Sequence, residues 1–209
     1  MSRITLAQAA KWCGGSVPEK YARQSFFGAE NALSRLKPGM LYVAGENGSE
    51  EELASAIQKG AAAVLCRSCK AELPAIVVEN VAQALAEIAR EQRRRMGMKI
   101  VWITGSLGKS TTKEMADAIL HTTYRVGSTP VNVKDPLAMP MAILCMEEDT
   151  QVAVFELGVS DFQDIAYLGH VGRPDVGVIL NISMEQVAHI DSIEGVLLAK
   201  LEILEEMGK

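Results

Sequence analysis

The sequence has little of what marks membrane, secreted or nucleic-acid-binding proteins. None of its apolar runs approaches the roughly 20 residues that span a membrane. The opening stretch "MSRITLAQAAKWCGG" lacks the apolar core of a signal peptide, so we expect a cytoplasmic protein. The net charge of -5 provides no basic field for nucleic acid. The basic run Arg93-Arg94-Arg95 fits the solvated end of a helix, where cations are favourable.

Cysteine is also scarce, with four in the chain, and only Cys66 and Cys69 are closely spaced. That spacing is typical of redox motifs or of one half of a zinc site. A structural zinc needs four ligands, and the sequence has no second cysteine pair. We therefore interpret Cys66 and Cys69 as ordinary thiols in a loop after the strand "AAAVLC".

Hydrophobic residues are plentiful at 48 %, and in the first 97 residues they predict a small α/β domain. Two pairs of residues, Thr5 with Gln8 and Ser49 with Glu52, have the spacing of a capping box at a helix start. A third helix is expected from Asn80 to about Arg95. Short apolar strands are predicted at 40–44, 61–65 and 75–78. We place the domain boundary at Gly97, which gives domains of 1–97 and 98–209.

The second domain alternates apolar strands at 99–103, 151–157 and 175–181 with helices. This order predicts a parallel sheet covered on both faces, here part of a P-loop domain. Ligands of such sheets bind at the carboxyl ends of the strands. Those ends carry Thr104-Gly105, Glu156 and Asn181.

The segment "ITGSLGKSTTK" (103–113) predicts a phosphate-binding loop between a strand and a helix. Glycines let backbone N–H groups converge on a phosphate, a lysine reaches the β- and γ-phosphates, and a hydroxyl binds Mg²⁺. The pattern is the shorter G-x-x-G-K-S, because Ile103 stands where the eight-residue motif has glycine. We expect the amides of residues 106–110 to face one concavity; the alternative is a turn with an incidental lysine. The predicted nucleotide contacts are Gly105, Ser106, Leu107, Gly108, Lys109, Ser110 and Thr111.

The final segment, 191–209, predicts a helix with a capping box formed by Asp191 and Glu194. On a helical wheel Lys200 falls within an apolar stripe. A buried lysine costs free energy unless it is paired or chemically modified, which makes Lys200 a candidate site residue. The alternative is a side chain that snorkels to the surface. The other members of the stripe are Ile193, Val196, Leu204 and Met207.

Taken together, these segments resemble the Mur ligase family. The similar stretches keep the family's order along nearly the whole chain. Within the family the resemblance is greatest to members that join D-alanyl-D-alanine to a UDP-N-acetylmuramoyl peptide. The stretches are "LKPGMLYVA" (36–44), "TGSLGKSTTKEM" (104–115), "FELG" (155–158), "RPDVGVILNI" (173–182) and "SIEGVLLAKLEI" (192–203).

The resemblance implies an ATP-dependent amide-bond ligase of peptidoglycan precursor synthesis. In such an enzyme ATP phosphorylates a carboxylate, and an amine then attacks the acyl phosphate. The resemblance implies that Lys109 and the loop amides hold the phosphates, with Asn181 as a further nucleotide contact. It also implies that Ser110 and Glu156 hold one Mg²⁺. Lys200, when carbamylated, would be an oxygen ligand for a second Mg²⁺ and, with Lys109, a catalytic residue.

The chain departs from the family pattern at several positions. The family's histidine near the second metal falls on Gln186, and His189 is the alternative ligand three residues later. We therefore expect Lys200 to be unmodified in this chain. The family's uridine-contacting D-S-R falls on "ALS" (32–34). Its asparagine-rich motif N-x-N-N-x-x-G-x-P becomes "NVKDPLAMP" (132–140).

Family members are longer than this chain, so we expect no ligase turnover from these 209 residues alone. An incomplete sheet domain exposes apolar surface, which predicts self-association. The main alternative function is a catalytically silent relative that binds nucleotide as a regulatory or interaction module. Another is a family member that acts on a different acid, such as a folylpolyglutamate- or cyanophycin-type ligase. The stretch "SIEGVLLAKLEI" argues against that last function.

Overall fold

The structure is a computed structural model that describes residues 3–45, 48–70, 72–128, 137–158, 169, 171–183, 192–205 and 207. The chain forms two compact units. The first comprises Met1–Gln92 and Pro140–Glu148, and the second comprises Arg93–Met139 and Asp149–Lys209. The predicted boundary at Gly97 follows the helix in which the two units divide.

The first unit is built on a parallel sheet with the strand order β3-β4-β5-β6. Strands β1 and β2, which precede and follow the first helix along the chain, pair with each other in antiparallel fashion. The predicted strands at 40–44, 61–65 and 75–78 correspond to β4, β5 and β6. The elements are β1 (Ile4–Thr5), α1 (Leu6–Cys13), a 3-10 turn (Glu19–Tyr21), β2 (Ser25–Phe26), β3 (Ala29–Glu30), β4 (Leu41–Val43), α2 (Glu50–Gln58), β5 (Ala63–Cys66), β6 (Ala75–Val77) and α3 (Val81–Met96).

The helix starts of this unit follow the predicted capping residues. Thr5 and Gln8 form the complete capping box of α1. Ser49 caps α2, because its hydroxyl accepts the Glu52 N–H at 3.2 Å. The second bond of a capping box, from the Ser49 N–H to the Glu52 side chain, is replaced by a different one: the Glu52 carboxylate accepts from the Tyr42 hydroxyl. Burial, and after it the hydrogen bond to that carboxylate, raise the pKa of Tyr42. The predicted cap of α3 is confirmed, since the Asn80 side chain accepts a backbone N–H at 2.9 Å.

The second unit contains the predicted parallel sheet, with the strand order β10-β7-β9-β8. The α/β class expected from the sequence is therefore confirmed. β8 and α5 were not predicted. The elements are β7 (Lys99–Thr104), α4 (Lys109–Leu120), β8 (Val126–Ser128), β9 (Val152–Glu156), β10 (Val176–Ile179) and α7 (Ile193–Glu205). Helix α5 (Ala138–Leu144) lies mostly in the first unit, which includes Pro140–Glu148.

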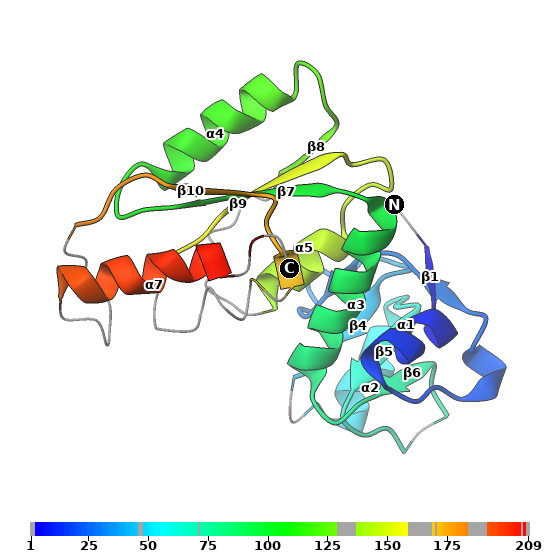
Figure 1. Cartoon of the computed structure of the whole chain (residues 1–209). Coiled ribbons are helices and arrows are strands. Elements are labelled where there is room, and N and C mark those ends of the chain that lie inside the picture. Colours follow the sequence, from blue (N-terminus) through cyan, green and yellow to red (C-terminus); the bar gives the residue numbers. More distant parts are fainter. Residues whose placement is uncertain are drawn as a thin grey trace. The chain divides into compact units, whose positions relative to one another are not determined.

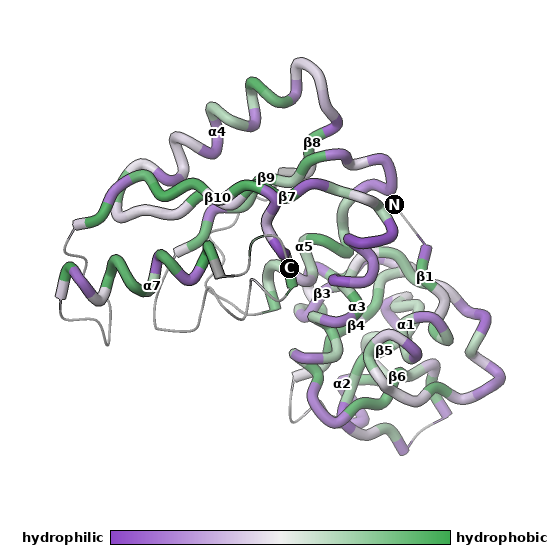
Figure 2. The backbone as a smooth tube through the Cα atoms, in the orientation of Figure 1, coloured by the Kyte–Doolittle hydropathy of each residue, from purple (hydrophilic) through white to green (hydrophobic). Residues whose placement is uncertain are grey.

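Helices cover both faces of this second sheet, as the apolar strands predict. Figure 1 shows α4 on one face and α7 on the other. On the α4 side, Ala116 and Leu120 pack against a cluster that includes Ile103 and Val154. On the α7 side, Ile203 lies against β10 at Gly177. Figure 2 shows hydrophobic residues concentrated along β9 and β10, with alternating polarity along α4 and α7.

Helix α7 differs in detail from its prediction. It begins at Ile193, and the Ser192 hydroxyl caps it by accepting the Gly195 N–H at 3.0 Å. Asp191, which the sequence predicts as the cap, lies outside the described residues. The stripe also differs, because Ile193 and Leu204 are exposed. The buried side chains of the helix are those of Val196, Ala199, Lys200 and Ile203.

Among the described residues, no helix is long and apolar enough to cross a membrane. Several positions of the sequence analysis lie outside the described residues. These are Gln186, His189 and residues 132–136.

Candidate functional site: the loop between β7 and α4

The chain turns sharply from β7 into α4, and two glycines make this turn. Gly105 has φ 150° and Gly108 has φ 83°, backbone angles that residues with a Cβ rarely adopt. A Cβ on Gly105 would also lie 2.9 Å from Leu180 Cβ. Helix α4 begins at the next residue, Lys109. The predicted succession of strand, glycine turn and helix is therefore present.

Strand register places the candidate side chains at one edge of the sheet. Ile103 of β7 pairs with Glu156 of β9, and Thr104 pairs with Ile179 of β10. The Thr104 hydroxyl donates to the Leu157 carbonyl at 3.2 Å, which ties the ends of β7 and β9 together. The loop, Glu156 and the residues after β10 thus meet where parallel sheets bind their ligands.

Lys109 lies at the start of α4, half-buried, with its ammonium folded onto the loop. Nζ donates to the Gly105 carbonyl at 2.7 Å and to the Ser106 carbonyl at 3.3 Å. Lys109 is neither enclosed in a core nor part of a helix continuous with β7, the two arrangements that would exclude a phosphate loop. Ser110 and Thr111 follow in the first turn, and both are exposed.

The predicted convergence of five loop amides is wrong for two of them. The Ser106 N–H donates to the Asn181 backbone carbonyl at 3.2 Å. The Leu107 N–H donates to Asn181 Oδ1 at 2.9 Å. The amides of residues 108–110 remain at the start of α4, where helix N–H groups lack intrahelical acceptors and the helix dipole favours anions. An anion-binding end of α4 would therefore be formed by three amides and not five.

Glu156 has the properties of a cation ligand. Only 7 % of the residue is exposed, and its carboxylate makes no hydrogen bond or ion pair with any part of the chain that the structure describes. A largely buried carboxylate is less well solvated than an exposed one, and a bound cation would offset part of that loss. The Glu156 carboxylate and the Ser110 hydroxyl are both oxygen donors, which Mg²⁺ prefers. These two residues fit the metal.

Lys200 is enclosed in the second unit. It is 1 % exposed on α7, so the alternative of a side chain that snorkels to the surface is wrong. An unmodified ammonium cannot bind a metal ion, so Lys200 fits a cation site only after its charge is removed. Within the described part of the chain, no three His, Cys, Asp or Glu side chains cluster as metal ligands do.

The sequence did not predict two polar pairs in this region. Lys113 is buried on α4, and its ammonium pairs with Asp117 at 3.0 Å. The i, i+4 spacing of the two residues is the signal that would have predicted this pair. The Ser106 hydroxyl accepts the Ser183 N–H at 2.9 Å and donates to the Ser183 carbonyl at 3.2 Å. No sequence signal marks that contact, because Ser183 follows the last predicted strand at no motif position.

In the first unit, the loop after β3 is closed by its own side chains. The Glu30 carboxylate accepts the Asn31 and Ala32 N–H groups at 2.9 and 3.0 Å, and the Arg35 guanidinium at 2.9 Å. Burial raises the pKa of Glu30, but the Arg35 and backbone hydrogen bonds outweigh it, so the pKa lies below its usual value. Residues 32–34, where the resemblance expects D-S-R, contribute no charged group.

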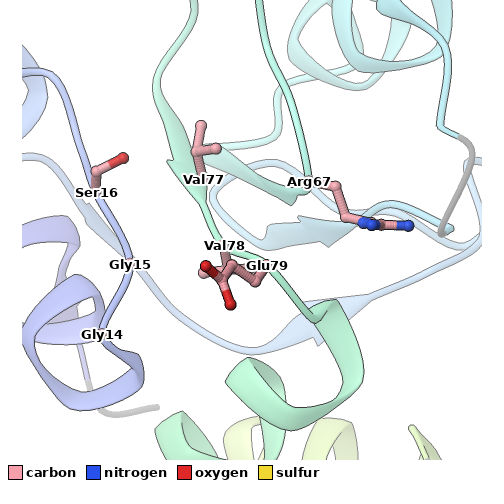
Figure 3. Close-up of a pocket in the computed structure, with 7 residues that line it drawn as sticks. All are labelled: Gly14, Gly15, Ser16, Arg67, Val77, Val78 and Glu79. Atoms are coloured by element: carbon pink, nitrogen blue, oxygen red, sulfur yellow. The ribbon is translucent and has the colours of Figure 1, made fainter.

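The first unit also has a cavity of ≈ 570 Å³ at the ends of β5 and β6. Its lining includes Gly14, Gly15, Val77 and Val78, with Arg67 among its charged side chains. In Figure 3 the Arg67 side chain extends away from the segment that carries the two glycines. Its one carboxylate is that of Glu79, and the lining adds no second acid, histidine, cysteine or lysine to work with it. The cavity is therefore not a candidate active site.

The prediction that Cys66 and Cys69 both lie in a loop is wrong for Cys66. All four are free thiols. Cys66, the last residue of β5, is buried, and burial raises its pKa to about 12. A thiol with so high a pKa is a poor nucleophile and a poor metal ligand.

Comparisons with known proteins agree with this geometry. Residues 103–209 match the family model "Mur ligase middle domain". A relative from Bacillus subtilis (strain 168), UDP-N-acetylmuramoyl-tripeptide--D-alanyl-D-alanine ligase, is 37 % identical over 153 residues, which cover 71 % of this chain and 34 % of that protein.

Solved structures agree with the sequence match. A crystal structure of MurF from Acinetobacter baumannii superposes with a TM-score of 0.88 at 25 % identity, over 100 % of this chain and 47 % of that one. MurF ligase from Thermotoga maritima in complex with ADP superposes with a TM-score of 0.77 at 26 % identity, over 87 % of this chain and 44 % of that one. The chain thus aligns with less than half the length of each of these proteins. The match over the second unit shows that this chain belongs to the Mur ligase family.

Proposed function

We propose that this chain supplies the N-terminal part of an ATP-dependent ligase that joins D-alanyl-D-alanine to a UDP-N-acetylmuramoyl peptide in peptidoglycan precursor synthesis. The observation that carries this proposal is the loop between β7 and α4, with buried Glu156 on the adjacent strand. The named relatives catalyse the same class of reaction. A cytoplasmic location belongs to the same proposal.

Each site residue has a role in this proposal. Lys109 leaves the loop carbonyls to contact the phosphates of ATP, while the amides at the start of α4 bind the phosphate oxygens. Ser110 and Glu156 hold Mg²⁺, which offsets negative charge on the triphosphate when bound. Their position beside the loop favours phosphoryl transfer, because stabilisation of the transferred group is the main catalytic requirement. Support for nucleotide binding comes from the similarity to the Thermotoga protein, whose structure contains ADP.

Lys200 has a conditional role. Its burial on α7 is expected for a lysine that carries a carbamate, since that group replaces the ammonium with an oxygen ligand. Mass spectrometry in bicarbonate buffer would detect the added carboxyl group. From the sequence we expect none in this chain.

A catalytically silent, nucleotide-binding relative is the second candidate. The closed loop after β3 favours it, because Glu30 and Arg35 satisfy each other where the family's uridine contacts are expected. Self-association is part of either proposal. The exposed leucines of α7, Leu197, Leu198 and Leu204, are its candidate surface.

The proposal is tested by titrating the chain calorimetrically with ATP, with and without Mg²⁺. Lys109→Met should weaken ATP binding by about tenfold or more, since a charge-assisted contact is lost. Lys11→Met, which removes an exposed lysine of α1, should leave it unchanged. An unchanged affinity in Lys109→Met would contradict the proposed site.

A second titration distinguishes the two candidates. The ligase should also bind UDP-N-acetylmuramoyl-tripeptide, which is the substrate named for the relatives. ATP binding without UDP-peptide binding would favour the silent relative.

A further inference from the structure

Asn181 was expected to contact nucleotide, but its side chain is already engaged. Asn181 Oδ1 accepts the Leu107 N–H at 2.9 Å, and Asn181 Nδ2 donates to the Leu107 carbonyl at 2.9 Å. Both polar atoms of the carboxamide therefore pair with one residue of the loop. The pairing also fixes the orientation of the carboxamide, since only this assignment matches donor to acceptor at both atoms.

The same segment holds the rest of the loop. The Leu180 N–H donates to the Thr104 carbonyl at 3.0 Å, and the Asn181 carbonyl accepts the Ser106 N–H. The Ser106 hydroxyl bonds both backbone groups of Ser183. The first half of the loop is thus attached to residues 180–183, and residues 108–110 alone remain available to an anion.

The chemistry of this contact requires a carboxamide. The N–H and C=O of Leu107 belong to the two peptide groups that flank the residue, and an asparagine or glutamine side chain carries on one carbon the acceptor oxygen and the donor nitrogen that match them. Aspartate would set a carboxylate oxygen against the Leu107 carbonyl, and alanine would leave both peptide groups without a partner. The Leu107 side chain takes no part in the contact and is 71 % exposed.

We propose that Asn181 is a positioning residue that clamps the backbone N–H and C=O of Leu107 and so keeps the loop between β7 and α4 in a shape ready for phosphate. This inference rests on the proposed nucleotide function and changes the expected role of Asn181 from ligand contact to support. A loop held in its bound shape before the ligand arrives loses less conformational entropy on binding.

Two measurements on Asn181→Ala test the clamp. The first is amide hydrogen exchange, resolved by NMR, in the absence of nucleotide. The Leu107 N–H should exchange at least about tenfold faster in the variant, because its acceptor is gone. The amides of Trp102 and Ile103 in β7 should be unchanged, which shows that the sheet remains folded.

The second measurement is the affinity for ATP with Mg²⁺. Asn181→Ala should weaken it by about tenfold, since two hydrogen bonds that preform the loop are lost. Asn31→Ala is the matched control, because it removes a carboxamide of the first unit that accepts from the exposed Arg35 at 3.4 Å and lies outside the loop between β7 and α4. It should alter neither the exchange of residue 107 nor the affinity.

The outcomes separate this inference from the proposed function. Unchanged exchange at Leu107 in Asn181→Ala would overturn the clamp. Faster exchange with unchanged affinity would overturn its role in preparing the loop. A wild-type chain that binds no ATP would overturn the proposed function and the nucleotide role, while the exchange result still decides whether Asn181 holds the Leu107 peptide.

Discussion

The two units have the same kind of sheet, but the polar groups at their strand ends differ. Both contain four parallel strands with apolar residues inside. After β3 of the first unit, Glu30 is satisfied by Arg35 and by two backbone amides of its own loop. At the end of β9 in the second unit, the Glu156 carboxylate has no partner within the described residues.

The two units therefore share the architecture of the sheet but differ in whether a polar group at the strand ends is available to a ligand. A parallel sheet brings loops together at one edge in either unit. Only a polar group left available at that edge can bind a ligand without first breaking a contact inside the protein. On this criterion we expect a charged ligand to bind at the strand ends of the second unit and not in the loop after β3.

The largest expected effect comes from the glycine that turns β7 toward α4. Gly105→Val should destabilise the second unit by about 2–4 kcal/mol, because φ 150° is strained for valine and its Cβ would press on Leu180. ATP binding should be lost as well. Urea unfolding can be followed by Trp102 fluorescence in a Trp12→Phe background.

The first unit provides the control for this glycine. Gly45 follows β4 at a comparable strand end, has no positive φ, and has open space where a Cβ would lie. Gly45→Ala should therefore change the free energy of unfolding by less than about 0.5 kcal/mol. An equal loss of stability in the Gly105 and Gly45 variants would contradict the claim that the turn after β7 requires a glycine.

A smaller effect is expected from opening the closed loop of the first unit. Glu30→Ala should lower its stability by about 1–2 kcal/mol, since two backbone N–H groups and Arg35 lose their acceptor. Arg35→Ala should cost less, about 0–1 kcal/mol, because its side chain is largely exposed. Chemical denaturation of each variant measures these differences. A change in ATP affinity on Glu30→Ala would show that the closed loop takes part in nucleotide binding.

The smallest effect concerns the opposite end of the second sheet. Asp175 accepts from Lys99, from Arg93 and from the Ile100 N–H. Burial raises its pKa, but these donors outweigh burial, so the folded-state pKa lies below the ordinary value. Its carboxylate therefore stabilises the fold above the unfolded-state pKa of about 3.9, and that stability is lost as pH falls through the lower folded-state pKa.

Asp175→Asn tests this dependence. The variant should be less stable than wild type by about 1 kcal/mol at pH 7, and the difference should shrink as the pH falls below about 4. Asp149→Asn is the control, because its pair with Arg125 is exposed and should contribute little. A difference between Asp175→Asn and wild type that stays constant down to pH 3 would contradict this role of Asp175.

Local sequence signals predicted most of the fold because they act through near neighbours. Capping residues such as Thr5 and Asn80 accept amide hydrogens three residues away. Apolar runs such as 99–103 identify a buried strand without reference to other segments. The glycines of the loop and the lysine that follows were likewise identified from one short stretch.

The elements and contacts that the sequence did not predict were missed for other physical reasons. Strands of two residues, such as β2 and β3, are too short to show a period. Helix α5 contains Pro140 within its first turn, where a missing N–H costs nothing, so a residue that normally breaks helices is tolerated. The partner of Asn181 could not be predicted, because Leu107 is 74 residues away in sequence.

The most direct test of the proposed nucleotide site at the loop between β7 and α4 is amide hydrogen exchange of the whole chain, measured with and without ATP and Mg²⁺. We expect nucleotide to protect the amides of residues 108–110 at the start of α4. The amides of Asn31 and Ala32, already bonded to Glu30, should not change. Protection of the loop after β3 with no protection at residues 108–110 would contradict the claim that the second unit holds the nucleotide site.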